Sequence, residues 1–552
     1  MNESTTVDAT IDLDSLGQEY VMLSKIFKQL TTLNDALTVL KRRTEIRRLL
    51  NQWSQAIHIQ LRTASSPSKP LELMCEWLPQ FNLWDRRFFK SVLSSSLSGE
   101  LEKHVGKARL ASWAQKQNLI HKDSVDTFCE ELKLVAHYDR LVGGAQVEFR
   151  DHKIPLHSLH AFMEGPVRGT RQSAMRCYWQ WFEENGPELD ETFQSLVNLR
   201  TEQAQQLGWK SVAEFMYARY DRTAYRPNDI GHFRNTLREL LAPILDDISD
   251  RQHQLLSLDT LNAWDLAVFN SQGNPLPVNT PDWLWNRAQE IFPKVSSRFA
   301  SLFQGPQAEV QLAPAIHRSL ESSYGIRNDT PLIQLNTHGT MDDITRLSNA
   351  MTNILAQRTA HHSTYGVQMD LDRSFILQKV MAILCLPHVE FLFPEDAEQY
   401  RWTYLLRELR TANQLLMQDH FQQLIYSKPE ASAGDRNGMW SRVEALYNPK
   451  INWGDLDHPA EGGAWHALSA LFTQPFSEIG EVIAIPYGFQ FLRFQQENPL
   501  RAQTRFEYLC DESFSPKAAQ SFLDIKSFEP LDINTISHLM ADIKRHAFSM
   551  MT

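Results

Sequence analysis

Apolar residues recur every three or four positions through most of the chain, which is the spacing of amphipathic helices. Residues 16–62 illustrate this pattern, with Leu16, Tyr20, Leu23 and Leu30 at helical intervals. The pattern predicts a mainly α fold. Strand-like alternation is confined to residues 147–159, which predict a short hairpin, and to residues 305–340, which predict a small β-sheet.

The segment MDDITRLSNAMTNILAQ, residues 341–357, predicts an amphipathic helix with an unusual polar face. Its buried stripe consists of Ile344, Leu347, Met351 and Leu355. Asn349 and Asn353 are four residues apart, so their side chains stand one above the other on the adjoining face.

Two stretches rich in small and polar residues predict breaks between helices. They are TASSPSKP at 63–70 and SKPEASAGDRNG at 427–438. In addition, Gly208 is predicted to end one helix, and Asp282 to cap the start of another.

Composition limits the class of protein. The chain has 552 residues, of which 42% are hydrophobic and 22% charged, with a net charge of −11. This size allows two to four domains or two large lobes. The acidic balance argues against nucleic acid and anionic membranes as partners. The basic run KRRTEIRR, residues 41–48, is predicted to be a solvated helix face.

The five cysteines are scattered and have no C-x-x-C spacing, which predicts reduced thiols in a cytoplasmic protein. The polar, acidic N-terminal stretch lacks the pattern of a signal peptide. No run of eighteen apolar residues occurs, so we expect no segment to span a bilayer.

Several segments in collinear order resemble one enzyme family. These are LVAHYDRLVGGAQVEFRDHKIPLHSL (134–159), LVNLRTEQAQQLGWKSVAEFMYARYDRTAYRPNDIGHFRNTL (196–237), SLDTLNAWDL (257–266), SSYGIRNDTPLIQLNTHGTMDDITRL (322–347) and WHALSALFTQPFSEIGEVIAIPYGFQFL (465–492). With them the chain resembles the oligoendopeptidase F branch of the thimet-oligopeptidase-like zinc peptidases.

The resemblance implies a two-lobed helical shell around a deep central channel. An N-terminal helical lobe would occupy residues 1–150. A peptidase-like domain would occupy residues 151–552, and about 305–500 would line the channel.

The family's chemistry requires the motif H-E-x-x-H on a helix, in which two histidines bind zinc and the glutamate activates a water molecule. The resemblance places Asn349, Ala350 and Asn353 at these positions, so the zinc site is predicted to be degenerate. A carboxamide is a weak zinc ligand beside imidazole, and alanine accepts no proton. For the third ligand, Asp370, Asp372 and Gln378 lie nearby, but none has the expected spacing.

The family's substrate-binding residues are also altered. Where the family has a late histidine and tyrosines after a tryptophan, this chain has His466 too early and Ser469, Leu471 and Ser477 at the expected places. The glycine pair before the strand edge is replaced by serines, with Tyr324 retained. The candidate ligand-binding cleft comprises Ser322, Ser323, Tyr324, His338, His361, Asp370, Asp372, His466 and Ser469.

Two other groups of residues could supply chemistry. A rebuilt metal site would draw on His361, His362, Asp370, Asp372 and His338, but adjacent histidines on a helix point about 100° apart. The pair His157 and His160 is predicted to lie on the surface. Cys385, with His388 close behind, is predicted to be a buried small hydrophobe and not a nucleophile.

Three functions remain open. The first is a catalytically inactive homologue, without metal or other cofactor, that binds a peptide, a peptide-like ligand or a protein partner in the ancestral channel. The second is a repurposed, metal-free enzyme acting on a peptide-like or biosynthetic intermediate, which predicts a cluster of titratable groups with shifted pKa values. The third and weakest is a residual oligopeptidase.

Overall fold

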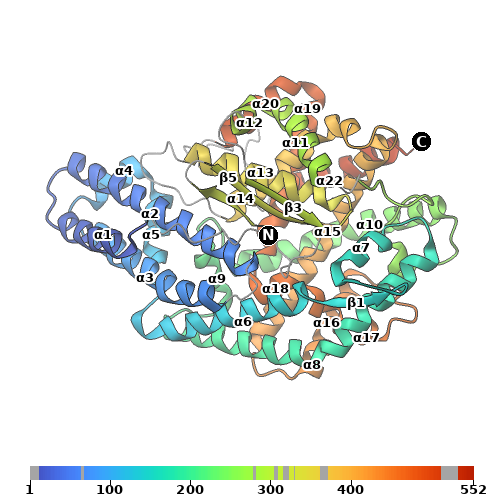
Figure 1. Ribbon diagram of the computed structural model, residues 1–552, viewed down its shortest axis with the longest axis horizontal. Helices are drawn as coiled ribbons and strands as arrows, with labels where there is room; N and C mark the ends of the chain where they lie inside the picture. Colours follow the sequence, from blue (N-terminus) through green and yellow to red (C-terminus); the bar gives the residue numbers. More distant parts are fainter. Residues whose placement is uncertain are drawn as a thin grey trace.

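The computed structural model describes residues 11–63, 68–277, 281–303, 309–314, 323–327, 330–360, 371–510 and 533–551. Helices dominate these residues, as predicted, and the strands are few and short (Figure 1).

The N-terminal helices are α1 (Leu13–Phe27), α2 (Leu33–Thr63), α3 (Ser68–Leu93), α4 (Ser98–Val105) and α5 (Lys107–Lys116). They form the blue group on the left of Figure 1. The predicted break at 63–70 is too wide, because α2 reaches Thr63 and α3 already begins at Ser68. The basic run on α2 is only partly solvated, since Arg43 is buried and forms an ion pair with the buried Asp85 of α3.

The next group starts with η1 (Lys122–Ser124) and α6 (Val125–Gly143) and continues through the predicted hairpin. It comprises β1 (Gln146–Phe149), β2 (His152–Pro155), η2 (Leu156–Ser158), α7 (Leu159–Met163), α8 (Arg168–Gln206), α9 (Val212–Arg219), α10 (Pro227–Leu256), η3 (Ala263–Asp265), α11 (Pro281–Val295) and α12 (Ser297–Phe303). β1 and β2 are antiparallel, which confirms the hairpin.

Both predicted helix-end signals in this part of the chain can be checked. Gly208 follows the end of α8 with φ of +78°, the left-handed conformation that commonly ends a helix. Asp282 is not a cap, because α11 already begins at Pro281 and places residue 282 inside its first turn. Proline at the first helical position has a suitable fixed φ and no amide hydrogen to leave unpaired.

The second sheet lies in the middle of the molecule and leads directly into the helix with the two asparagines. Its strands are β3 (Glu309–Pro314), β4 (Ser323–Arg327) and β5 (Thr330–Thr337), which confirms the β-sheet predicted near 305–340. β5 is central, parallel to β3 and antiparallel to β4. After β5 the chain turns into α13 (Asp342–Ala360), which packs against β4 and β5.

Helices and short 3₁₀ segments make up the rest of the described chain. They are α14 (Leu371–Cys385), η4 (Leu386–Phe391), α15 (Ala397–Ser427), α16 (Ala433–Tyr447), α17 (Asp457–Ala460), η5 (Gly463–Ala467), α18 (Ser469–Thr473), α19 (Glu478–Glu497), α20 (Pro499–Leu509) and α22 (Ile533–Ser549). α14 packs against α13, α19 and η4, and η4 also packs against α15.

The predicted loop at 427–438 is shorter than the sequence suggested. α15 ends at Ser427 and α16 begins at Ala433, so only five residues lie between these helices. The reason is a capping box, in which Ser432 and Asp435 satisfy each other's backbone amides and start the helix.

Among the described residues, one stretch has the length and apolar composition of a membrane-crossing helix, Leu371–Phe391. It comprises α14 and η4, which pack against other helices of the fold, and a buried core helix has the same composition.

Buried hydrophobic side chains form two clusters. One runs from Leu13 to Trp113 and the other from Tyr138 to Ala547. α6 contacts both, because Leu132 packs on the first cluster and Leu134 on the second. The division into lobes at residue 150 and the central channel stay predictions.

Candidate functional site

The turn between β5 and α13 fixes where α13 begins. Gly339 has φ of +75°, which favours glycine, and the side chain of Asp343 accepts hydrogen bonds from the backbone amides of His338 and Gly339 at 2.7–3.0 Å. A carboxylate at this end also interacts favourably with the helix dipole. Burial nevertheless raises the pKa of Asp343, against these hydrogen bonds. The helix is therefore held firmly at its start.

The predicted apolar stripe of α13 is confirmed, since Ile344, Leu347, Met351 and Leu355 are all buried. The three positions predicted to be a degenerate metal site lie within this helix. Asn349 is half-buried, Ala350 is fully buried and Asn353 is 1% exposed.

Asn353 forms hydrogen bonds with α14 instead of facing an open space. The hydroxyl of Ser374 donates to Oδ1 of Asn353 at 2.7 Å, and Nε2 of Gln378 donates to the same hydroxyl at 2.9 Å. We call this series Asn353–Ser374–Gln378 the amide chain. Nδ2 of Asn353 has no hydrogen-bond partner among the described residues. The amide chain is uncharged throughout.

These residues do not fit a zinc ion. The one good acceptor of Asn353 already binds a hydroxyl, its Nδ2 has no lone pair to offer, and Ala350 cannot act as a base. No histidine anywhere in the sequence is followed by glutamate, so H-E-x-x-H is absent from the chain. In the part of the chain that the structure describes, no group of three or more His, Cys, Asp or Glu side chains is arranged to hold a metal ion.

Asp372 was predicted to line the cleft, but both of its carboxylate oxygens accept hydrogen bonds from other side chains. Nε of Arg222 donates to its Oδ1 at 2.9 Å, and the hydroxyl of Tyr225 donates to its Oδ2. Arg222 also donates to the carbonyls of Phe476 and Ser477. The contact therefore joins the start of α14 to the segment after α9 and to the segment before α19.

His338 lies in a cluster of imidazoles beside the start of α13. Its ring stacks on that of His157 with centroids 5.0 Å apart and on that of His160 at 6.1 Å. Arg346 lies 2.9 Å from a ring nitrogen of His338. Burial and the Arg346 charge lower the pKa of His338, and burial lowers the pKa of His160 to about 4. The surface prediction is wrong for His157, which η2 turns into the core, whereas His160 on α7 is half-buried.

Charged groups continue from this cluster into α15. Arg407 pairs with Asp342 at 3.1 Å and with Glu164 at 3.3 Å. Nδ2 of Asn274 donates to the same Glu164 oxygen at 2.8 Å. Burial raises the pKa of Glu164 despite Arg407.

One sequence signal could have revealed that His157 and His160 lie together. They are three residues apart, a spacing that places two side chains on one helical face.

His466 and Ser469 belong to a different part of the fold. His466 is 1% exposed, with Nδ1 3.2 Å from Nε2 of His458 and Nε2 3.4 Å from Oδ1 of Asp190. Burial lowers the pKa of His458 to about 4. Ser469 is half-buried at the start of α18. Their segment packs on α8 and α17, whereas α13 packs on α12, α14 and the sheet.

The remaining candidate residues lie outside α13. Cys385 is buried, and burial raises the pKa of its thiol to about 12, which supports its prediction as a small hydrophobe. Ser323 and Tyr324 lie on β4, an edge strand of the sheet. Ser322, His361, His362 and Asp370 lie outside the described residues.

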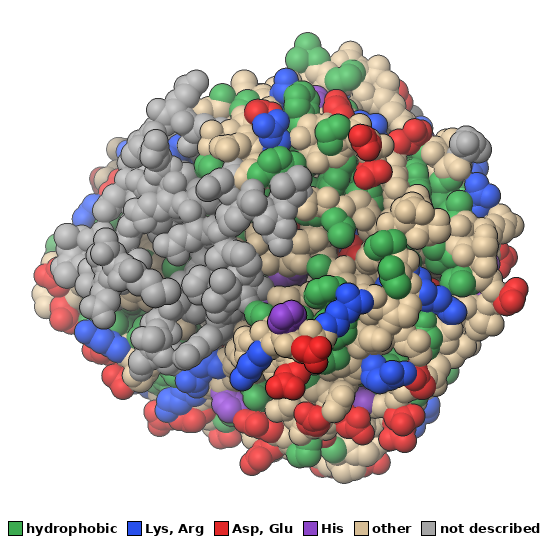
Figure 2. Space-filling view, turned by 45° about the vertical axis from the view of Figure 1, so that its right-hand side comes forward, with side chains coloured by type: hydrophobic (Ala, Val, Ile, Leu, Met, Phe, Trp, Pro, Cys, Tyr) green, Lys and Arg blue, Asp and Glu red, His purple; other side chains and the backbone are tan. Residues whose placement is uncertain are grey.

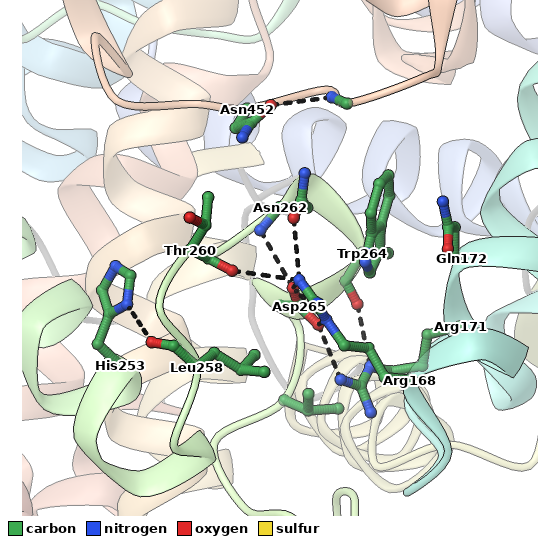
Figure 3. A network of polar contacts seen from close by, with 12 residues as sticks. Arg168, Arg171, Gln172, His253, Leu258, Thr260, Asn262, Trp264, Asp265 and Asn452 are labelled. Atoms are coloured by element: carbon green, nitrogen blue, oxygen red, sulfur yellow. Dashed lines mark hydrogen bonds and ion pairs between the residues drawn. The ribbon is translucent and has the colours of Figure 1, made fainter.

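A family-model comparison finds a match over part of the chain. Residues 161–277 match the model of peptidase family M3. A polar network lies within this segment (Figure 3), where Arg168 and Arg171 bind the buried Asp265 at 2.7 and 2.8 Å. Burial opposes ionisation, yet hydrogen bonds from both arginines keep the pKa of Asp265 below its usual value. The network ties the start of α8 to the loop before η3.

Solved structures show a similar fold over almost the whole chain. A protein assigned as an oligoendopeptidase F is 23% identical with a TM-score of 0.91, covering 98% of this chain and 97% of its own. PZ peptidase A with an inhibitor is 22% identical with a TM-score of 0.91, covering 98% of each chain. A protein assigned as an oligoendopeptidase F from Bacillus anthracis str. Ames is 21% identical with a TM-score of 0.86, covering 100% and 99%.

The search of curated proteins gives no match for this sequence. The two positive comparisons support the predicted resemblance. The chain has the helical fold of oligoendopeptidase F and the sequence pattern of peptidase family M3 over residues 161–277.

Proposed function

We propose that this chain is a non-hydrolytic homologue of the M3 peptidases that binds a peptide, a peptide-like ligand or a protein partner in the channel of the ancestral fold. The single observation that carries the proposal is the amide chain on α13 and α14. Asn353 is bound to Ser374 and Gln378, and the neighbouring Ala350 has no functional group.

Hydrolysis by this family's chemistry needs a Lewis acid and a general base, and Asn349, Ala350 and Asn353 supply neither. Retention of the scaffold supports a binding role. The similar fold of PZ peptidase A was solved with an inhibitor, which is consistent with a ligand site in this architecture. We further propose a cytoplasmic protein whose partners are neither nucleic acid nor membrane. Its net charge of −11 supports this, and acidic and basic side chains are interspersed on the described part of the face in Figure 2.

The test combines metal analysis, turnover and binding. Purified protein is analysed for zinc, incubated with a quenched fluorescent peptide library with and without chelator, and titrated with the labelled library in a polarisation assay. We expect no stoichiometric zinc, no chelator-sensitive cleavage and saturable binding. Bound zinc together with chelator-sensitive cleavage would refute the proposal, and so would the absence of any saturable binding.

A pair of variants locates the binding site. Asn349→Arg places a long cation on the half-buried face of α13, whereas Gln205→Arg makes the same change in charge on an exposed position of α8. We expect Asn349→Arg to weaken peptide binding at least about tenfold, which corresponds to about 1.4 kcal/mol, and Gln205→Arg to leave it unchanged. Equal effects of both variants would remove α13 from the proposed site.

The imidazole cluster supports a second candidate, the repurposed metal-free enzyme. Its alternative chemistry would use the neutral rings of His338 and His160 beside Asp342 and Arg407. Mass spectrometry of a recovered bound ligand after incubation distinguishes the two functions. A product whose formation is lost in His160→Gln would favour the enzyme. A residual oligopeptidase, the weakest candidate, is tested by the same fluorescent library.

A further inference from the structure

Two cysteines from different helices meet where the two hydrophobic clusters join. Cys75 lies on α3, in the N-terminal group, and Cys129 lies on α6, the helix that contacts both clusters. Sγ of Cys129 donates to the carbonyl of Cys75 at 3.3 Å, and Sγ of Cys75 lies 3.8 Å from the carbonyl of Cys129. Each thiol thus contacts the backbone carbonyl of the other cysteine, so the two thiols are neighbours.

The sequence explains why the carbonyl of Cys75 is available. In an α-helix, residue 79 would donate its amide hydrogen to the carbonyl of residue 75. Residue 79 is a proline inside α3, and proline has no amide hydrogen. The carbonyl oxygen of Cys75 therefore accepts a hydrogen bond from the thiol of Cys129, and this contact holds the cysteine of α6 against α3.

The surroundings fit a pair that is reduced at rest but able to react. Both cysteines are partly exposed and free. Burial raises the pKa of Cys75, and burial together with the neighbouring thiol raises the pKa of Cys129 to about 12. Lys133, one turn further along α6, lowers both values slightly through its charge. Raised values keep the thiols protonated and slow to react until an oxidant is abundant.

We propose that Cys75 and Cys129 form a redox modification site, in which a small-molecule disulfide such as oxidised glutathione converts the pair into an intramolecular disulfide. One thiolate attacks a sulfur of the small disulfide and releases one small thiol. The second protein thiolate then attacks the resulting mixed disulfide and releases the other. Two protein thiols are oxidised, one small disulfide is reduced to two thiols, and the two protons leave with them.

The consequence is mechanical. The new bond would join α3 covalently to α6 and so fix the N-terminal helices to the helix shared with the second cluster. It closes a loop between residues 54 positions apart, which restricts the unfolded chain. We expect the oxidised protein to have a thermal midpoint about 5 °C higher than the reduced protein.

The full chain is incubated with oxidised glutathione, denatured, and its thiols are counted and mapped by alkylation and mass spectrometry. We expect the count to fall from five to three, with a peptide pair linking Cys75 to Cys129 and the loss of two hydrogen masses. Wild-type protein that retains all five thiols, or that acquires only glutathione adducts, would overturn the proposal.

The matched control is Cys177, another partly exposed cysteine, whose thiol contacts the carbonyl of Glu148. Cys177→Ser should still form the linked peptide and the higher thermal midpoint. Cys75→Ser should form neither, and Cys129→Ser provides a second variant should Cys75→Ser fold poorly. A higher midpoint in Cys75→Ser after oxidation would show that another modification is responsible.

Discussion

α14 has two polar faces, one stabilised by hydrogen bonds between neutral groups and the other by ion pairs. Toward α13 it presents Ser374 and Gln378, which join Asn353 in the uncharged amide chain. Toward α15 and α19 it presents Lys379, whose ammonium group lies 2.8 Å from Glu408 and 2.9 Å from Glu481. Adjacent residues of one helix therefore belong to a neutral cluster and to a charged one.

This difference shows that the interior around α14 does not exclude charge. Lys379 and Glu408 are both buried, and each has a partner of opposite sign at ion-pair distance. The amide chain, which includes the adjacent Gln378, is therefore uncharged because of the residues on the α13-facing side of α14, and not because the interior excludes charge. A charged ligand set would need a bound cation there, whereas the hydroxyl of Ser374 links the two carboxamides without one.

The largest expected effect comes from removing the cation of the charged face. Lys379→Met leaves Glu408 and Glu481 without their shared partner, and we expect the free energy of unfolding in urea to fall by about 3–5 kcal/mol. Adding Glu408→Gln to this variant should restore part of the loss, because one unpaired charge is removed. A loss below about 1 kcal/mol would contradict the view that these charges depend on each other.

A smaller effect is expected on the neutral face. Ser374→Ala removes the hydroxyl between Asn353 and Gln378 and should lower the free energy of unfolding by about 2 kcal/mol, since it leaves buried polar atoms unpaired. The control is Ser173→Ala, an exposed serine of α8 whose hydroxyl donates to the carbonyl of Gly169. Equal losses in the two variants would mean that the amide chain contributes nothing particular.

The pH dependence separates the two faces further. Burial already raises the folded-state pKa of Glu408. A carboxyl group with a raised pKa binds protons better in the folded state, so its stabilising contribution is present at low pH and is lost as pH rises through that pKa. We therefore expect the loss in Lys379→Met to be about 1 kcal/mol smaller at pH 5 than at pH 8. The loss in Ser374→Ala should be the same at both pH values.

The smallest effect is expected at Asn349, which is half-buried on α13. Asn349→Ala should change the free energy of unfolding by less than about 0.5 kcal/mol, because alanine favours helix and no large group is removed. Combined with the binding assay, this variant separates a role in ligand recognition from one in folding. A loss above about 1 kcal/mol would assign Asn349 to the packed core.

The sequence predicted the helical class, the hairpin, the small sheet and the stripe of α13, because these depend on local periodicity. It did not predict the partner of Asn353, since Ser374 is 21 residues away and its hydroxyl could have faced any neighbour. It placed His157 and His160 on the surface for a similar reason. The burial of His157 depends on how η2 turns, which periodicity does not encode.

Asp372 is a second residue whose partners the sequence did not predict. The sequence placed this residue among those of the candidate ligand-binding cleft, and in the structure its carboxylate accepts hydrogen bonds from Arg222 and Tyr225. Only the tertiary fold brings residues 222 and 372 together, so their pairing could not be read from either segment. The role of the residues outside the described ranges stays a prediction.

The contact centred on Arg222 has a consequence for motion. A single guanidinium group holds the beginning of α14 and the two carbonyls just before α19, and it is itself buried. These segments cannot shift independently without breaking a charge-assisted hydrogen bond. Movement of α14 relative to α19 therefore requires Arg222 to give up one of these partners.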